Sequence, residues 1–166
     1  MDCNQQLDLL FQEMISYFEG DAKRIQHFVK VHSFARLIAH EEKLSDEQCF
    51  ILEAAAYVHD IGIKPAEQIY GSANGKYQEL LGPKQAEIIL KKCGFPKDAI
   101  DRICYLVAHH HTYESIDFID YQILVEADFL VNLYEDNTSK TAIENAYAKI
   151  FKTTTGKSLC KTIYKV

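Results

Sequence analysis

Hydrophobic residues recur every three or four positions along most of the chain, which is the spacing of one face of an α-helix. Residues 7–18 follow this spacing, and Gly20 ends the pattern. A second segment with helical spacing runs from Asp21, a candidate N-cap, to about Glu42. Because no run of alternating polar and apolar residues indicates strands, the sequence predicts an all-α fold.

Capping and helix-breaking residues mark the further helices. Ser45 and Gln48 have the spacing of a capping box, and the helix that they start runs into His59 and Asp60 before Gly62 stops it. The remaining predicted helices start at Pro83, at Pro96, near Asp120 and near Ser139, and the last of them ends at about Phe151.

Two stretches lack clear periodicity. In residues 63–82, Pro65 can start a short helix, and three glycines then punctuate the sequence YGSANGKYQELLG (70–82). We expect either a loop that covers a substrate or a solvated connection there. The tail, residues 153–166, has Thr and Gly enough to be irregular, and its pattern assigns it to no element.

Length and charge limit the classes of protein to consider. The chain has 166 residues, which favours one domain, and its net charge of −6 argues against binding duplex nucleic acid. A small phosphorylated substrate stays compatible with this charge, because a bound cation changes the local balance. No apolar run of membrane-spanning length and no secretory signal is present, so we expect a cytoplasmic protein without a membrane partner.

The number and spacing of the cysteines argue against disulfide bonds and against a zinc site made of cysteines. The five cysteines include no C-x-x-C pair, and their number is odd. We therefore expect free thiols, with neither a disulfide framework nor a cysteine zinc site.

Several polar residues fall on the apolar faces of the predicted helices. His27 shares a helical stripe with Val31 and Phe34, and His59 and Asp128 each follow two apolar residues by three and four positions. A lone histidine on such a face is usually a structural core residue. An isolated carboxylate in a core is costly, however, and a cation shared by groups from three helices removes that cost.

The types of these side chains narrow the choice of metal. Together with Asp60, they supply two imidazoles and two carboxylates, without sulfur. Such a set suits a divalent ion of manganese, iron, cobalt, nickel, zinc or magnesium and disfavours copper(I).

The sequence around these residues resembles the HD superfamily of metal-dependent phosphohydrolases, which is named for a His-Asp pair. The matching segments come in the family's order, and they are RIQHFVKVHSFARLIA (24–39), AAAYVHDIGIK (54–64), GPKQAEIIL (82–90), CYLVAHHHTY (104–113) and ILVEADFLVNL (123–133). The first segment selects His27 rather than His32. The combined pattern is specific, whereas no single segment is.

The resemblance implies a single HD-type domain over residues 1–166, with a core of five to seven helices at about 20–135 and a C-terminal helix and tail at 136–166. It also implies four metal ligands, which are His27, His59, Asp60 and Asp128. Asp60 would bridge two ions where two are bound.

A second metal is left open by the resemblance. Some branches of the family bind it through a histidine just before the glycine that corresponds to Gly82, and Leu81 occupies that position here. Glu79 or a histidine of the triple His109–His111 could contribute instead. Three neighbours at a helix end cannot all face one site, because successive residues turn by about 100°.

The expected reaction is attack of a metal-bound water on the phosphorus of a phosphate ester, with a nucleotide or other small phosphorylated metabolite as substrate. Asp60 would orient or deprotonate the water, Lys64 would hold a phosphate, and His110 would act as a proton donor or extra ligand. The further substrate contacts expected are Lys30, His109 and His111. For both lysines, a solvated surface charge is an equal alternative.

Two other functions stay open. Some proteins of this fold are di-iron oxygenases, although Leu81 departs from the six-ligand set that they need. A non-catalytic metal- or ligand-binding regulatory module is the other alternative, because a fold alone does not define a function. A homodimer is equally open, since a helical stripe has the same pattern inside a core and against a second copy.

Overall fold

The computed structural model describes residues 1–166, which form α-helices and no strand, as the sequence predicts. The helices are α1 (Cys3–Tyr17), α2 (Ala22–Glu41), α3 (Asp46–Val58), α4 (Ile63–Tyr70), α5 (Gly75–Lys92), α6 (Lys97–His109), α7 (Ile119–Glu135), α8 (Lys140–Lys149) and α9 (Thr154–Tyr164). None of them combines the length and the hydrophobicity needed to cross a membrane.

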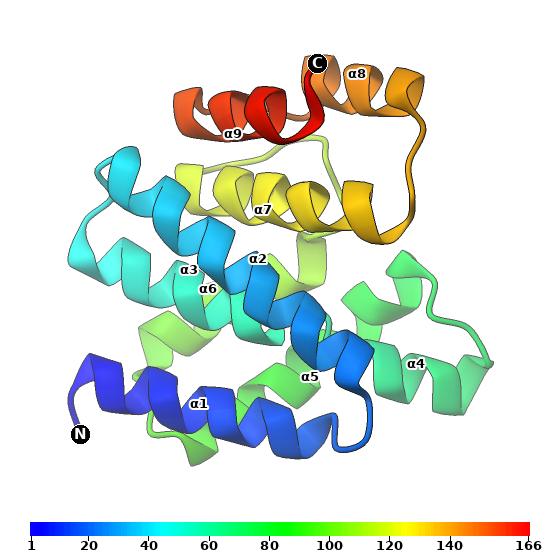
Figure 1. The fold of residues 1–166 in the computed structure, drawn as a ribbon. Coiled ribbons are helices and arrows are strands. Elements are labelled where there is room, and N and C mark those ends of the chain that lie inside the picture. Colours follow the sequence, from blue (N-terminus) through cyan, green and yellow to red (C-terminus); the bar gives the residue numbers. More distant parts are fainter.

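Three helices meet at the centre of the molecule. The long helix α2 packs against α3 and α7, and α3 also contacts α7, α6 and α1. On the far side, α5 packs against α6 and α4. Figure 1 shows α8 and α9 as a layer over α7, with α1 at the opposite end. The helices that carry the polar core residues of the sequence, α2, α3 and α7, are therefore the central ones.

Local capping explains where several of these helices begin. The predicted capping box of α3 is confirmed, because the Ser45 hydroxyl accepts from the Gln48 N–H while the Gln48 side chain accepts from the Ser45 N–H. The Asp21 carboxylate caps α2 by accepting from the Arg24 N–H. Pro96 precedes α6, also as expected.

The prediction of an irregular stretch at residues 70–82 is wrong. Helix α5 already begins at Gly75, with Asn74 as its cap, and only residues 71–74 separate it from α4. These few residues are too short for the covering loop considered above. Pro83 likewise lies inside α5 rather than in a first turn.

The glycines at positions 62 and 82 permit close packing: Gly62 precedes α4, and Gly82 lies within α5. A Cβ atom at Gly62 would lie 2.5 Å from the carbonyl oxygen of Gln78, and a Cβ atom at Gly82 would lie 2.7 Å from Val107 Cγ1. Backbone therefore packs on backbone between the turn after α3 and α5. This contact holds the His59-Asp60 turn against α5.

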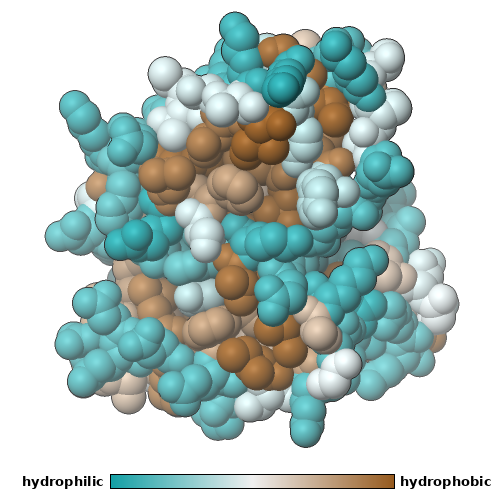
Figure 2. All heavy atoms as spheres, in the orientation of Figure 1, coloured by the Kyte–Doolittle hydropathy of each residue, from teal (hydrophilic) through white to brown (hydrophobic).

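The tail that the sequence pattern assigned to no element forms α9. Thr153 caps it by accepting from the Gly156 N–H, which offsets the poor helix propensity of its threonines. Its buried residues face the rest of the molecule, and α9 contacts α7, α8 and α2. Figure 2 shows hydrophobic residues where α9 lies over α7, surrounded by polar side chains.

Candidate metal centre

Four polar side chains from the three central helices meet in the core. His27 lies in α2, His59 is the C-cap residue of α3, Asp60 follows it, and Asp128 lies in α7. His27, His59 and Asp128 are only 6%, 0% and 3% exposed. Polar groups buried this deeply need partners, so their mutual geometry decides what they can do.

The distances within this group match those between ligands of one ion. His27 Nε2 lies 3.2 Å from His59 Nε2 and 3.1 Å from Asp128 Oδ1. Asp60 Oδ2 lies 3.3 Å from His27 Nε2 and 3.5 Å from His59 Nε2. Ligand atoms about 2.1 Å from an ion are about 3.0–3.4 Å apart in octahedral or tetrahedral geometry. His27, His59 and Asp60 therefore present ligand atoms close enough for one divalent ion, and Asp128 Oδ1 lies beside the Nε2 atoms of both histidines.

The outer nitrogens of the two histidines determine which atoms face the centre. His59 Nδ1 lies 2.9 Å from the Ala56 carbonyl oxygen, and His27 Nδ1 lies 3.2 Å from a Glu135 carboxylate oxygen. Because these oxygens only accept, each Nδ1 carries the proton and each neutral Nε2 presents a lone pair. Two lone pairs and two carboxylate oxygens then converge, and none of these four atoms is itself a donor. Such a set requires a cation or added protons.

The pKa values of the metal-free group also indicate that positive charge is stabilised there. Burial lowers the pKa of His59, but Asp60 and Asp128 outweigh it and raise that pKa to about 9. Burial raises the pKa of both carboxyl groups, yet the imidazoles beside them bring both well below the usual range. Without an ion, protons take the position that a metal would occupy.

A second group of possible ligands shares Asp60 with the first. His110 Nε2 lies 3.4 Å from Asp60 Oδ1, while its Nδ1 lies 2.8 Å from the Val107 carbonyl oxygen. His110 is 1% exposed, and its Nε2 has no hydrogen-bond partner. Asp60, His110 and His111 present ligand atoms close enough for one ion. Asp60 thus directs one oxygen toward each group.

Glu79, a candidate ligand from the sequence, anchors the chain after α6 instead. Its carboxylate accepts from the His111 N–H at 3.0 Å and from the Thr112 hydroxyl at 3.0 Å. His111 Nε2 lies 3.1 Å from the side-chain oxygen of Gln78. Burial and the neighbouring His110 lower the pKa of His111 to about 4, so its imidazole is neutral at pH 7.

The structure places the other site candidates of the sequence outside these two groups. His109 stacks on Tyr105, and its Nδ1 bonds to the Tyr105 carbonyl oxygen. Lys30 Nζ pairs with Glu135 at 2.8 Å. Lys64 Nζ donates to the Tyr17 carbonyl oxygen at 2.8 Å.

A polar cavity of about 360 Å³ opens beside the metal group. His27 and Asp60 line it, and Ile63 is its one hydrophobic wall residue. Lys23 and Arg24 belong both to this cavity and to a neighbouring one of about 750 Å³.

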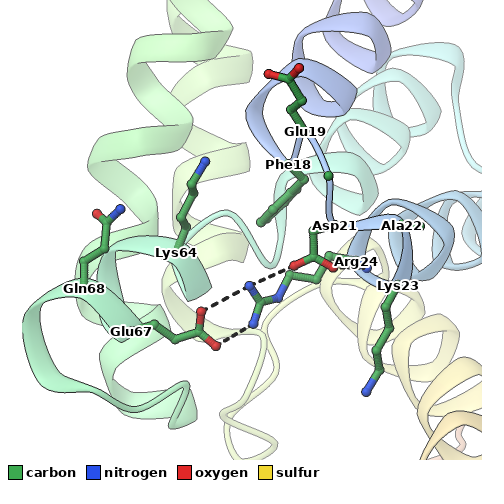
Figure 3. A pocket seen from close by; sticks show the side chains of 10 residues that line it. Phe18, Glu19, Asp21, Ala22, Lys23, Arg24, Lys64, Glu67 and Gln68 are labelled. Carbon is green, nitrogen blue, oxygen red and sulfur yellow. Dashed lines mark hydrogen bonds and ion pairs between the residues drawn. The ribbon is translucent and has the colours of Figure 1, made fainter.

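Figure 3 shows the neighbouring cavity. There the Arg24 guanidinium lies between Asp21 and Glu67, while Lys64 and Lys23 point to opposite sides of this cluster. Neither lysine has a carboxylate partner within ion-pair distance, whereas Arg24 has two.

The sequence patterns did not single out three residues around the metal group. Asn132 donates to Asp128 Oδ1 at 2.9 Å, and Glu135 contacts His27. Both lie on the helical face of Asp128, four and seven residues further on, so their spacing was an available signal. Lys23, at the cavity, has no such signal because its position depends on the packing of α2.

These features define a class of all-helical proteins in which a His-Asp pair, a further histidine and a further aspartate can hold a divalent ion in the core. A sequence profile of the HD domain matches residues 24–152, which is more than half of the chain. The chain therefore belongs to the HD domain family, as the resemblance implied.

Two solved structures share the fold. One is the crystal structure of a predicted HD superfamily hydrolase from an uncultured Thermotogales bacterium, with a TM-score of 0.64 and 24% identity over 98% of this chain and 84% of that one. The other is Bacillus subtilis YpgQ, with a TM-score of 0.67 and 18% identity over 99% of this chain and 91% of that one. No curated protein matches the chain.

Proposed function

We propose that the protein is a metal-dependent phosphohydrolase, which cleaves a phosphate ester of a nucleotide or another small phosphorylated metabolite. The observation that carries this proposal is the convergence of two imidazole nitrogens and two carboxylate oxygens, none of them a donor, beside a polar cavity. Membership of the HD domain family and the fold shared with a predicted HD superfamily hydrolase support it.

The residues divide the chemistry between them. A bound divalent ion supplies the means to lower the pKa of water and to neutralise charge on phosphoryl oxygens. Asp60 has the most exposed side chain of the four, at 17%, so its carboxylate is the one that reaches the cavity. From there it can orient the attacking water and accept its proton.

The cavity supports a small, strongly polar substrate. With a single hydrophobic wall residue it offers little surface to an apolar ligand. Lys23 and Lys64 are cations without carboxylate partners, one beside the metal group and one in the adjoining cavity. We assign them to the phosphate oxygens of the substrate.

A screen of phosphate esters tests the proposal. The metal-free protein should be incubated with Mn²⁺, Fe²⁺, Co²⁺, Ni²⁺, Zn²⁺ or Mg²⁺ and with nucleotides and other small esters, and phosphate release measured. We expect release only with added metal. His40→Ala, a substitution in an exposed histidine at the end of α2, serves as a matched control and should match the wild type.

Three outcomes would contradict the proposal. Two bound irons with oxygen consumption would favour the oxygenase. Bound metal without turnover of any ester, or no bound metal at all, would favour the binding module.

We also propose a second divalent ion held by Asp60, His110 and His111. The buried, unpartnered Nε2 of His110 supports it, because such an atom otherwise carries the full cost of its desolvation. His110 then acts as a ligand rather than a proton donor, since its proton is on Nδ1, bonded to the Val107 carbonyl oxygen. Asp60, which directs one carboxylate oxygen toward each group, would be shared by the two groups.

His110→Ala is expected to reduce the bound manganese from two ions per chain to one. The substitution removes a ligand of the second group and leaves the first group intact. Elemental analysis after equilibrium dialysis measures the stoichiometry. His109→Ala provides the matched control, because His109 is the adjacent residue and lies outside both groups. Two ions in the His110→Ala protein, or one in the wild type, would contradict the assignment.

A further inference from the structure

The orientation of His27 depends on a charged side chain, unlike that of the other buried histidines of the centre. His59 and His110 direct Nδ1 to backbone carbonyl oxygens within their own helical turns. His27 Nδ1 instead lies 3.3 Å and 3.2 Å from the two carboxylate oxygens of Glu135. Its ring is therefore held by a residue 108 positions away in the sequence.

Glu135 connects two helices at the edge of the metal group. It is the last residue of α7, seven positions after Asp128, and its side chain is 13% exposed. Lys30, three positions after His27 on α2, pairs with the same carboxylate at 2.8 Å. Glu135 thus receives a proton donor and a cation from α2 at the same time.

We propose that Glu135 is a positioning residue, which orients His27 as a metal ligand, and that Lys30 holds Glu135 in place. A carboxylate that accepts from Nδ1–H fixes the tautomer of a histidine, aims its Nε2 lone pair and increases its basicity. With Nδ1 engaged, Nε2 of His27 points toward Asp128 and Asp60, at 3.1 Å and 3.3 Å.

The ion pair with Lys30 gives this arrangement its specificity. Three carboxylates surround His27, and Asp60 and Asp128 direct their oxygens to Nε2. Glu135 is kept on the other side of the ring, because Lys30 binds it there and offsets its charge. Lys30 therefore contributes to the metal site through Glu135, whereas the sequence analysis considered it as a phosphate contact.

Substitution of Glu135 tests the inference through metal affinity. We expect Glu135→Leu to raise the dissociation constant for Mn²⁺ about 10- to 100-fold, the range found for lost partners of ligating histidines. Glu135→Gln keeps an acceptor oxygen but loses the charge, and its loss should be smaller. Titration calorimetry on the metal-free full-length protein measures both. Asp136→Asn is the matched control, because Asp136 is the next residue and lines the same cavity without contacting His27.

A second readout does not require metal. In the metal-free protein at a pH where His27 is neutral, nitrogen-15 NMR should find its proton on Nδ1 in the wild type. The Glu135→Leu protein should show a mixture of tautomers, and Lys30→Met a smaller change. Wild-type Mn²⁺ affinity in Glu135→Leu, or an unchanged His27 tautomer, would overturn the inference.

The inference rests on the proposed metal centre, but the two can fail separately. If Mn²⁺ binds and the Glu135 variants weaken it while no ester is cleaved, the inference holds and the hydrolase proposal fails. If the wild-type protein binds no divalent ion, the hydrolase proposal fails and the role of Glu135 as the orienting residue is decided by the tautomer measurement. Glu135→Gln and Lys30→Met supply the answer if Glu135→Leu does not fold.

Discussion

Asp60→Ala is expected to lose its bound divalent ions and at least about 100-fold of any phosphohydrolase activity. Loss of a residue that only orients a ligand costs about 10- to 100-fold, and loss of the ligand itself should reach at least the upper end of this range. Asp60 is also the one residue that faces both groups, with Oδ2 3.3 Å from His27 Nε2 and Oδ1 3.4 Å from His110 Nε2. Its removal therefore affects both groups of possible ligands at once.

Metal content and phosphate release should be measured on the same protein samples. Asp101→Ala serves as the control, since it removes an exposed carboxylate paired only with Lys97 on the surface of α6. Circular dichroism of the Asp60→Ala protein should keep the helical spectrum of the wild type, because Asp60 lies in the turn between α3 and α4. A variant that keeps its metal and its activity would show that Asp60 is not a ligand and that the proposed reaction is wrong.

The helices with regular periodicity could be predicted from the sequence. The start of α3 at the Ser45–Gln48 capping box and the position of Asp128 within α7 both follow from local patterns. Local patterns failed where glycine serves packing between helices. Gly75 lies against the ring of His111, so that a Cβ atom at this position would lie 2.9 Å from His111 Cγ, and Gly82 lies against Val107. Their roles depend on neighbours that the sequence does not place.

The site likewise combines features that local sequence patterns predict with features that depend on how the helices pack. Periodicity correctly placed His27, His59 and Asp128 on buried faces, because each lies on a stripe of apolar residues. Their convergence within ligand distances depends on how α2, α3 and α7 cross. For the same reason the pattern singled out His109 beside His110, although only His110 reaches Asp60. The assignment of these residues as metal ligands stays a prediction until metal binding is measured.

Glu126 is a further polar residue whose role is visible only in the fold. It lies in α7, two positions before Asp128, and its side chain is 0% exposed. The carboxylate accepts from the N–H groups of Lys152 and Thr153 at 2.6 Å and 2.9 Å, and from the side chain of Gln122 at 2.7 Å. These bonds join α7 to the segment that starts α9. A buried glutamate in a hydrophobic run thus anchors the C-terminal layer.

Glu126→Ala is accordingly expected to destabilise the protein by about 2–4 kcal/mol, since each buried donor left without an acceptor costs about 1–3 kcal/mol. For a chain of this length, that corresponds to a lowering of Tm by roughly 5–15 °C. Thermal and urea unfolding followed by circular dichroism measure the change. Glu144→Ala, an exposed carboxylate on α8, should stay within about 0.5 kcal/mol of the wild type.

Gly156→Ala tests the same anchor from the other side. A Cβ atom at Gly156 would lie far inside contact distance of the Glu126 carboxylate, so the added methyl must displace that side chain or α9. We expect Gly156→Ala to lose about as much stability as Glu126→Ala. The double variant should lose less than the sum of the two single losses, because both substitutions disrupt one contact. Full additivity would mean that the two residues act separately. Wild-type stability of Glu126→Ala would show that the carboxylate does not hold the C-terminal layer on α7.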